Sequence, residues 1–161
     1  MKAIVTGSFD PITLGHMEII KYASEKYDKV YVVALVNETK EYMFTMAQKK
    51  RLIELAVSDY DNVIADAYSG MTADYMHKHG ITQIVRGVRN EQDVKYEKDL
   101  AEKMKAFDSE FETEIVVCEE QFAEISSTEI RNRLKNNVSI KGLLPESILS
   151  EVIDIYKANT H

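Results

Sequence analysis

The sequence predicts an α/β fold in which a parallel sheet of five strands is covered by helices on both faces. Short apolar runs rich in β-branched residues alternate with longer amphipathic segments along the chain. Such runs, flanked by turn-forming or charged residues, are typical of buried strands. Their alternation with helical segments indicates βαβ units and therefore a parallel, doubly wound sheet. No Pro-, Gly- or Ser-rich linker interrupts the pattern, so we expect residues 1–161 to form a single domain.

Each element of this fold is predicted from a local pattern. The expected strands span residues 3–5, 30–36, 63–67, 84–86 and 114–118. The expected helices span residues 15–26, 45–57, 71–79, 91–107, 126–135 and 145–158. Two of these helices begin with the spacing of a capping box, formed by Thr45 with Gln48 and by Ser126 with Glu129.

Composition narrows the class of protein. A chain of 161 residues is long enough to bury a full hydrophobic core without disulfides or a structural metal. Its formal net charge of −7 disfavours nucleic acids and anionic membrane surfaces as partners. The first apolar run is too short for a signal peptide or a membrane-spanning helix, so we expect a cytoplasmic location. The lone cysteine, Cys118, cannot form an internal disulfide, and we expect a buried core thiol.

The first polar cluster follows the first expected strand, where ligands bind in sheets of this kind. Gly7 permits a close ligand approach, and Gly15 and His16 fall at the start of the next helix, where free N–H groups favour an anion. The alternative is a plain strand-to-helix turn with a surface histidine. Neither the dinucleotide-binding glycine fingerprint nor a P-loop is present, so phosphate binding would need another device.

Cationic residues follow the second and fourth expected strands. Lys40 would reach over the strand ends as a point charge, unless it is a solvated loop residue. Arg86 and Arg89 can grip phosphate oxygens with forked donors. The alternative for this pair is a structural ion pair with Asp93 or Glu97. We expect Lys40, Arg86 and Arg89 to face one pocket together with His16.

A run of hydroxyl residues opens the helix expected at residues 126–135. Ser126 is explained by helix capping, but capping does not require the hydroxyls of Ser127 and Thr128 as well. A helix N-terminus with free N–H groups and adjacent hydroxyls favours binding of a phosphate.

Three segments together resemble the nucleotidyltransferase superfamily. They read Gly-Ser-Phe-Asp-Pro-Ile-Thr-Leu-Gly-His at residues 7–16, Arg-Gly-Val-Arg at 86–89 and Ile-Ser-Ser-Thr-Glu-Ile-Arg at 125–131. Residues 13–16 are similar to its T/H-x-G-H motif. Within the superfamily the chain resembles the phosphopantetheine adenylyltransferase family over nearly its whole length. Lys40 before Met43, and Tyr96 with Glu97 after the arginine segment, match that family.

The resemblance implies a fold, a reaction and an assembly. It implies a Rossmann-like nucleotidyltransferase fold and reversible transfer of AMP from ATP to 4′-phosphopantetheine. The products would be dephospho-coenzyme A and pyrophosphate, in coenzyme A biosynthesis. It also implies Mg²⁺ bound with ATP, a homohexamer and feedback inhibition by coenzyme A.

The resemblance also assigns roles to residues. The catalytic residues would be His16, Lys40 and Arg89. The ATP-binding residues would be Ser8, Phe9, His16, Gly87, Val88, Arg89, Glu97, Phe122, Ala123, Glu124, Ile125, Ser126, Ser127 and Thr128. The acceptor phosphate would be held by Ser8, Lys40, Thr72 and Arg86, and no side chains are expected to form a metal site.

The chain departs from the family pattern at a few positions. Ser8 stands where threonine is usual, and Met104 stands where an asparagine is usual on the helix beside the acceptor. Thr128 and the following Glu-Ile-Arg look more like nicotinate mononucleotide adenylyltransferases. Two alternatives therefore stand beside the main interpretation. One is a sister transferase acting on nicotinate mononucleotide or glycerol 3-phosphate, and the other is a nucleotide-binding regulatory protein without turnover.

Overall fold

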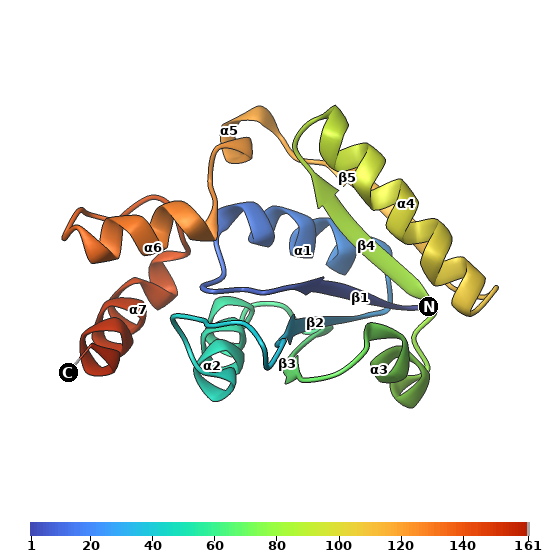
Figure 1. Cartoon of the computed structure of the whole chain (residues 1–161), viewed down its shortest axis with the longest axis horizontal. Coiled ribbons are helices and arrows are strands. Elements are labelled where there is room, and N and C mark those ends of the chain that lie inside the picture. Colours follow the sequence, from blue (N-terminus) through green and yellow to red (C-terminus); the bar gives the residue numbers. More distant parts are fainter. Residues whose placement is uncertain (161) are drawn as a thin grey trace.

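The computed structural model describes residues 1–160 and contains the expected five-stranded parallel sheet (Figure 1). The strand order is β3-β2-β1-β4-β5, so the chain winds outward from β1 in both directions. The strands are β1 Lys2–Gly7, β2 Lys29–Leu35, β3 Val63–Tyr68, β4 Gln83–Val88 and β5 Glu112–Val117. The prediction of a doubly wound α/β fold is confirmed.

Six longer helices lie where the amphipathic segments predict them, and one short helix was not predicted. The helices are α1 Leu14–Lys26, α2 Met46–Ala56, α3 Thr72–His79, α4 Glu91–Phe107, α5 Glu120–Ala123, α6 Ser127–Lys135 and α7 Glu146–Asn159. The missed helix, α5, has only four residues, too few to show a periodic pattern. No helix within residues 1–160 is long and apolar enough to cross a membrane.

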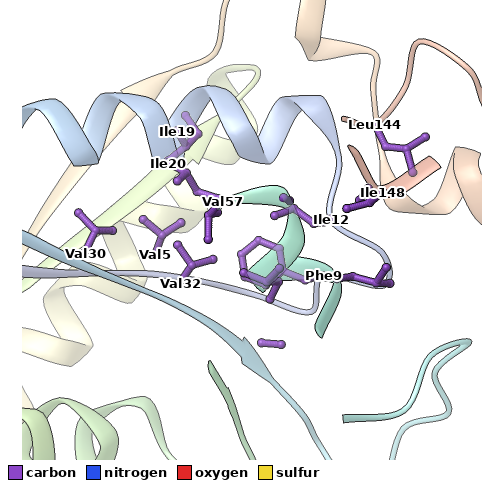
Figure 2. Close-up of a cluster of buried hydrophobic side chains, with 14 of the residues drawn as sticks. Val5, Phe9, Ile12, Ile19, Ile20, Val30, Val32, Val57, Leu144 and Ile148 are labelled. Carbon is purple, nitrogen blue, oxygen red and sulfur yellow. The ribbon is translucent and has the colours of Figure 1, made fainter. Parts of the chain in front are cut away.

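Strand side chains alternate between two hydrophobic clusters, one on each face of the sheet. Val30 and Val32 of β2 pack in the larger cluster, whereas Tyr31 and Val33 pack in the smaller one. This two-residue period is that of a strand buried on both faces. Figure 2 shows part of the larger cluster, where Val5 and Val32 lie near α1.

Side-chain caps fix where the helices begin. The predicted capping box of α2 is present, because Thr45 and Gln48 each accept the other's backbone N–H. Only half of the capping box predicted for α6 forms. Ser126 accepts the backbone N–H of Glu129 at 3.1 Å, but the Glu129 carboxylate accepts from Arg133 and not from the Ser126 backbone. Caps of this kind satisfy N–H groups that the first helical turn leaves unpaired. At the start of α6 the N–H groups that are not capped lie near the carboxyl ends of the strands.

Candidate active site

A cavity of about 390 Å³ opens at the carboxyl ends of β1 and β4. These two central strands are neighbours in the sheet, and α5 and α6 lie beyond their ends (Figure 1). The polar and small residues lining the cavity are Thr6, Gly7, Thr13, Gly15, His16, Arg86, Gly87, Arg89, Asp93, Tyr96, Glu97, Cys118, Ser126 and Ser127. Three of the four expected cationic and histidine side chains therefore meet in one place.

His16 is held by the cap of its own helix. Its Nδ1 accepts the backbone N–H of Thr13 at 3.0 Å, and its own backbone N–H donates to the Thr13 hydroxyl. The ring of Phe9 packs edge-on against it, with 4.7 Å between the ring centroids. Because Nδ1 accepts a hydrogen bond, the neutral ring carries its proton on Nε2. His16 thus presents an N–H donor to the cavity in a fixed orientation.

The same surroundings keep the His16 ring neutral. Burial first, and then the positive charges of Arg86 and Arg89, together lower the pKa of His16 to about 4. At neutral pH His16 therefore acts on an anion as a hydrogen-bond donor and not as a cation. Its contribution depends on position, because a neutral donor has no long-range attraction.

Arg86 is paired inside the protein. Its Nε and Nη2 donate to the two carboxylate oxygens of Glu97, each at 2.9 Å. Its Nη1 donates to the backbone oxygen of Thr6 at 2.9 Å and to the Thr6 hydroxyl at 2.7 Å. The alternative of a structural ion pair with Glu97 is therefore confirmed. An arginine fork has five N–H donors, so one remains for a ligand.

Arg89 is paired more loosely, at the exposed rim of the cavity. Its Nε lies 3.4 Å from a carboxylate oxygen of Asp93, which also accepts the Arg89 backbone N–H. Together the two arginines and their two carboxylates carry no net charge. The cavity thus offers directional donors and not an excess of positive charge.

The N-terminus of α6 closes the cavity beside His16. Ser126 and Ser127 line the wall, and the Ser127 hydroxyl donates to the backbone oxygen of Pro11 at 2.7 Å. A Cβ atom added at Gly15 would lie 3.5 Å from the backbone oxygens of Phe122 and Ile125. That distance is ordinary van der Waals contact, so the segment before α6 packs closely over the start of α1.

Lys40 does not share this cavity. It lines neighbouring surface depressions together with Ser8, and one of these also includes Asp10 and Arg131. The expectation that Lys40 faces the same pocket as His16, Arg86 and Arg89 is wrong for this structure. The loop after β2 is tied to the turn after β1, because the buried Asp10 carboxylate accepts the backbone N–H groups of Met43 and Phe44, each at 2.9 Å.

The other residues expected at the site fall into three groups. Gly87, Glu97, Phe122, Ile125, Ser126 and Ser127 line the main cavity. Thr72 lines a second, smaller cavity that also contains Arg86 and Glu97. The side chains of Phe9 and Val88 are buried in the core, and neither these residues nor Ala123, Glu124 and Thr128 line the main cavity.

Thr6, Thr13 and Cys118 are among the site residues to which the sequence interpretation gave no role. Cys118 is only partly buried and lines the cavity, because β5 ends at Val117 and the next residue turns toward the mouth of the sheet. Burial raises the pKa of its thiol, so the thiol is protonated at neutral pH. Thr13 orients His16, and the spacing of three residues between them was the signal in the sequence.

The described residues show no cage of side chains for a metal ion. No group of three or more His, Cys, Asp or Glu side chains between residues 1 and 160 is arranged to hold one. Asp10, on the turn after β1, accepts backbone N–H groups with both of its carboxylate oxygens.

Comparison with known proteins agrees with this geometry. A family model described as cytidylyltransferase-like matches residues 4–133. The chain is 38% identical over 152 residues to the phosphopantetheine adenylyltransferase of Clostridium novyi, covering 94% of each chain. It is also 38% identical over 147 residues to that of Bdellovibrio bacteriovorus, covering 91% of this chain and 92% of the relative.

This chain belongs to the phosphopantetheine adenylyltransferase family. The fold is shared more widely. A Vibrio parahaemolyticus structure described as a nicotinate-nucleotide adenylyltransferase superposes with a TM-score of 0.62 over 99% of this chain and 98% of that one. At 19% identity that likeness shows the fold alone. The family resemblance seen in the three sequence segments is thus confirmed over 94% of the chain.

Proposed function

We propose that this chain transfers AMP from ATP to 4′-phosphopantetheine, giving dephospho-coenzyme A and pyrophosphate in a reversible reaction. Two findings support the proposal: the names of the relatives that match over more than nine-tenths of the chain, and the cavity at the ends of β1 and β4. The observation that carries it is the meeting of His16, Arg86 and Arg89 with the N-terminus of α6.

The nucleotide would occupy the larger cavity, with its phosphates at the start of α6. The free N–H groups and the positive dipole end of a nine-residue helix favour anionic oxygens there. His16 would donate its Nε2–H to an oxygen on the α-phosphorus, and Arg89 would reach the phosphates from the rim. Because the ring orientation is fixed by Thr13, this donor needs no reorganisation as charge develops.

The reaction requires few proton transfers. An oxygen of the acceptor phosphate forms a bond to the α-phosphorus of ATP, and the bond from that phosphorus to the bridging oxygen of the β-phosphate breaks. Pyrophosphate leaves with the electron pair. The attacking phosphate is already anionic near neutral pH, so no general base is needed. The chain's contribution is therefore to position two anions and to stabilise the charge that shifts to the leaving group.

Magnesium would accompany the nucleotide. Since no carboxylate cluster is arranged to hold a metal within residues 1–160, the donor set fits an ion bound to the phosphate oxygens of ATP. When bound, it would neutralise part of the phosphate charge. The protein residues would then bind and orient the metal–nucleotide complex as one unit.

The acceptor would approach from the side of the smaller cavity. Thr72 and Arg86 line it together with apolar residues, among them Met104. Ser8 and Lys40 lie at the end of β1 and on the loop after β2, on a separate depression. We propose that Lys40 contributes after a movement of its loop, because Lys40 and Arg86 line different hollows in this structure.

The direct test is incubation of the purified chain with ATP, Mg²⁺ and 4′-phosphopantetheine, followed by mass spectrometry for dephospho-coenzyme A and by pyrophosphate release. Parallel reactions with nicotinate mononucleotide and glycerol 3-phosphate test the sister transferases. We expect product from 4′-phosphopantetheine only. Turnover of another acceptor would reassign the substrate, and ATP binding without pyrophosphate release from any acceptor would favour a regulatory protein.

The assembly and regulation expected for this family are part of the proposal. We propose a cytoplasmic homohexamer that coenzyme A inhibits. Light scattering during gel filtration measures the mass of the particle. Inhibition that ATP relieves would place coenzyme A at the nucleotide cavity.

A further inference from the structure

The two cavities described above are separated by a partition that consists of Thr6, Arg86 and Glu97. Thr6, Arg86 and Glu97 line both the larger cavity and the smaller one, which has a volume of about 80 Å³. The remaining lining of the smaller cavity is Thr72, Ile84, Leu100, Ala101, Met104 and Thr113. A ligand in either cavity would therefore lie beside the same ion pair.

The ion pair leaves Arg86 little freedom. Glu97 uses both carboxylate oxygens on Arg86, and Thr6 accepts two further hydrogen bonds from its Nη1. Four of the five guanidinium N–H groups are thereby committed, and one on Nη2 is left. The Glu97 side chain is 7% exposed and that of Arg86 is 25% exposed, so solvent weakens the pair only slightly. Both carboxylate oxygens of Glu97 face Arg86, so any effect of Glu97 on a ligand passes through Arg86.

The need to dock α4 does not explain this pair. Glu97 is the buried residue of α4, a helix of 17 residues. Burying a carboxylate is costly even when it is paired, and a well-packed apolar pair of similar volume is often as stable or more stable. An apolar pair at positions 86 and 97 would dock the helix against β4 about as well. The carboxylate does something that an apolar residue would not: it fixes the direction of a guanidinium.

We propose that Glu97 is a positioning residue, which holds the Arg86 guanidinium in the partition between the two cavities. The inference rests on the proposed function, in which the nucleotide occupies the larger cavity and the acceptor approaches from the side of the smaller one. The two reacting phosphates must meet at the boundary between the cavities. A guanidinium fixed at that boundary can donate its one free N–H to an oxygen of one anion while its positive charge lies beside the other.

The kinetic test compares two variants, in each of which an amide side chain replaces an acidic one. Glu97→Gln keeps the shape of the side chain and removes its charge. We expect it to raise the KM for ATP and the KM for 4′-phosphopantetheine, each by about 10-fold, the scale of one charged hydrogen bond. Asp93→Asn is the matched control, because Asp93 pairs with Arg89 and lines only the larger cavity. We expect it to raise the KM for ATP alone. A Glu97→Gln enzyme with one KM or neither changed would overturn the proposal.

A spectroscopic test needs neither substrate nor turnover. In ¹H–¹⁵N spectra the Nε–H of Arg86, assigned by its loss in Arg86→Lys, should exchange slowly with water in the wild type and quickly in Glu97→Gln. Rapid exchange in the wild type would show that Glu97 does not fix Arg86. If the wild type turns over no acceptor, the proposed function fails, yet this measurement still decides whether Glu97 positions Arg86.

Discussion

Two substitutions at His16 separate its two ring nitrogens. The amide oxygen of His16→Asn reaches about where Nδ1 lies and can still accept the Thr13 N–H, but the variant has no group at the place of Nε2. We expect kcat to fall by ~10²–10³-fold, the cost of losing one preorganised donor to a transition-state oxygen. The free energy of unfolding should change little, because the hydrogen bond that starts α1 survives.

His16→Gln makes the opposite exchange. Its amide nitrogen reaches about the place of Nε2, so part of the turnover should remain. The Thr13 N–H loses its acceptor, which should lower the free energy of unfolding by about 1 kcal/mol. Pyrophosphate release under single-turnover conditions and urea unfolding measure the two quantities. If His16→Asn turned over near the wild-type rate, His16 would have no part in stabilising the transition state.

The lowered pKa of His16 also predicts how the free energy of unfolding depends on pH. Burial, followed by the two arginine charges, lowers that pKa to about 4, below the 6.5 of an unfolded histidine. The folded ring stays neutral between these values while the unfolded ring takes up a proton. Stability from this source is therefore complete above pH 6.5 and is lost as the pH falls toward 4. His16→Asn should lose less stability than the wild type over that window, and the wild-type rate should show no His16 step near pH 6.5.

Further substitutions test other contacts. Lys49 is 1% exposed, and its ammonium has no hydrogen-bond partner within residues 1–160. Lys49→Met should therefore raise the free energy of unfolding by about 1–2 kcal/mol in urea, and a decrease would show that the contact of the ammonium with the Tyr42 ring outweighs the cost of its burial. A Cβ at Gly87 would lie 2.7 Å from Ile19 Cγ1, so Gly87→Ala should cost about 1–3 kcal/mol, and adding Ile19→Ala should cost less than the sum of the two single changes. Lys40→Ala should lower turnover at an unchanged melting temperature, whereas Arg86→Ala should also destabilise the fold by about 3–5 kcal/mol, because it leaves a buried carboxylate unpaired.

The fold could be predicted because each element carries its own local signal. The central strands are buried on both faces, so their apolar runs are continuous and easily seen. The ends of the helices followed from side chains such as Thr45 and Ser126, whose hydrogen bonds are formed within one turn. The exact ends of the strands were less certain, and the structure extends several of them by one or two residues. Ladder hydrogen bonds set those ends, and they depend on the partner strand and not on the run itself.

The candidate site could be predicted only as far as topology determines it. Parallel strands bring their carboxyl ends to one edge, which placed His16, Arg86 and Arg89 together. Whether Arg86 was free or paired depended on how α4 returns along the sheet, and no local pattern encodes that. Lys40 was misplaced because its loop is tied to Asp10 through Met43, which lies more than thirty residues after Asp10, and no local pattern encodes that contact. Cys118 was expected in the core, as the last residue of a strand over residues 114–118. The strand β5 ends at Val117, so Cys118 lies one residue beyond it.

The charge balance of the site connects its structure with catalysis. A cavity with two unpaired arginines and a charged histidine would bind ATP strongly before reaction, and that energy would not speed the chemical step. Here Glu97 and Asp93 offset the arginines, and burial keeps His16 neutral. What remains is a set of short-range donors with fixed directions. Such donors act strongly only on a charged oxygen that reaches the position at which they point. An oxygen that reaches this position only in the transition state is therefore stabilised more there than in the bound substrate.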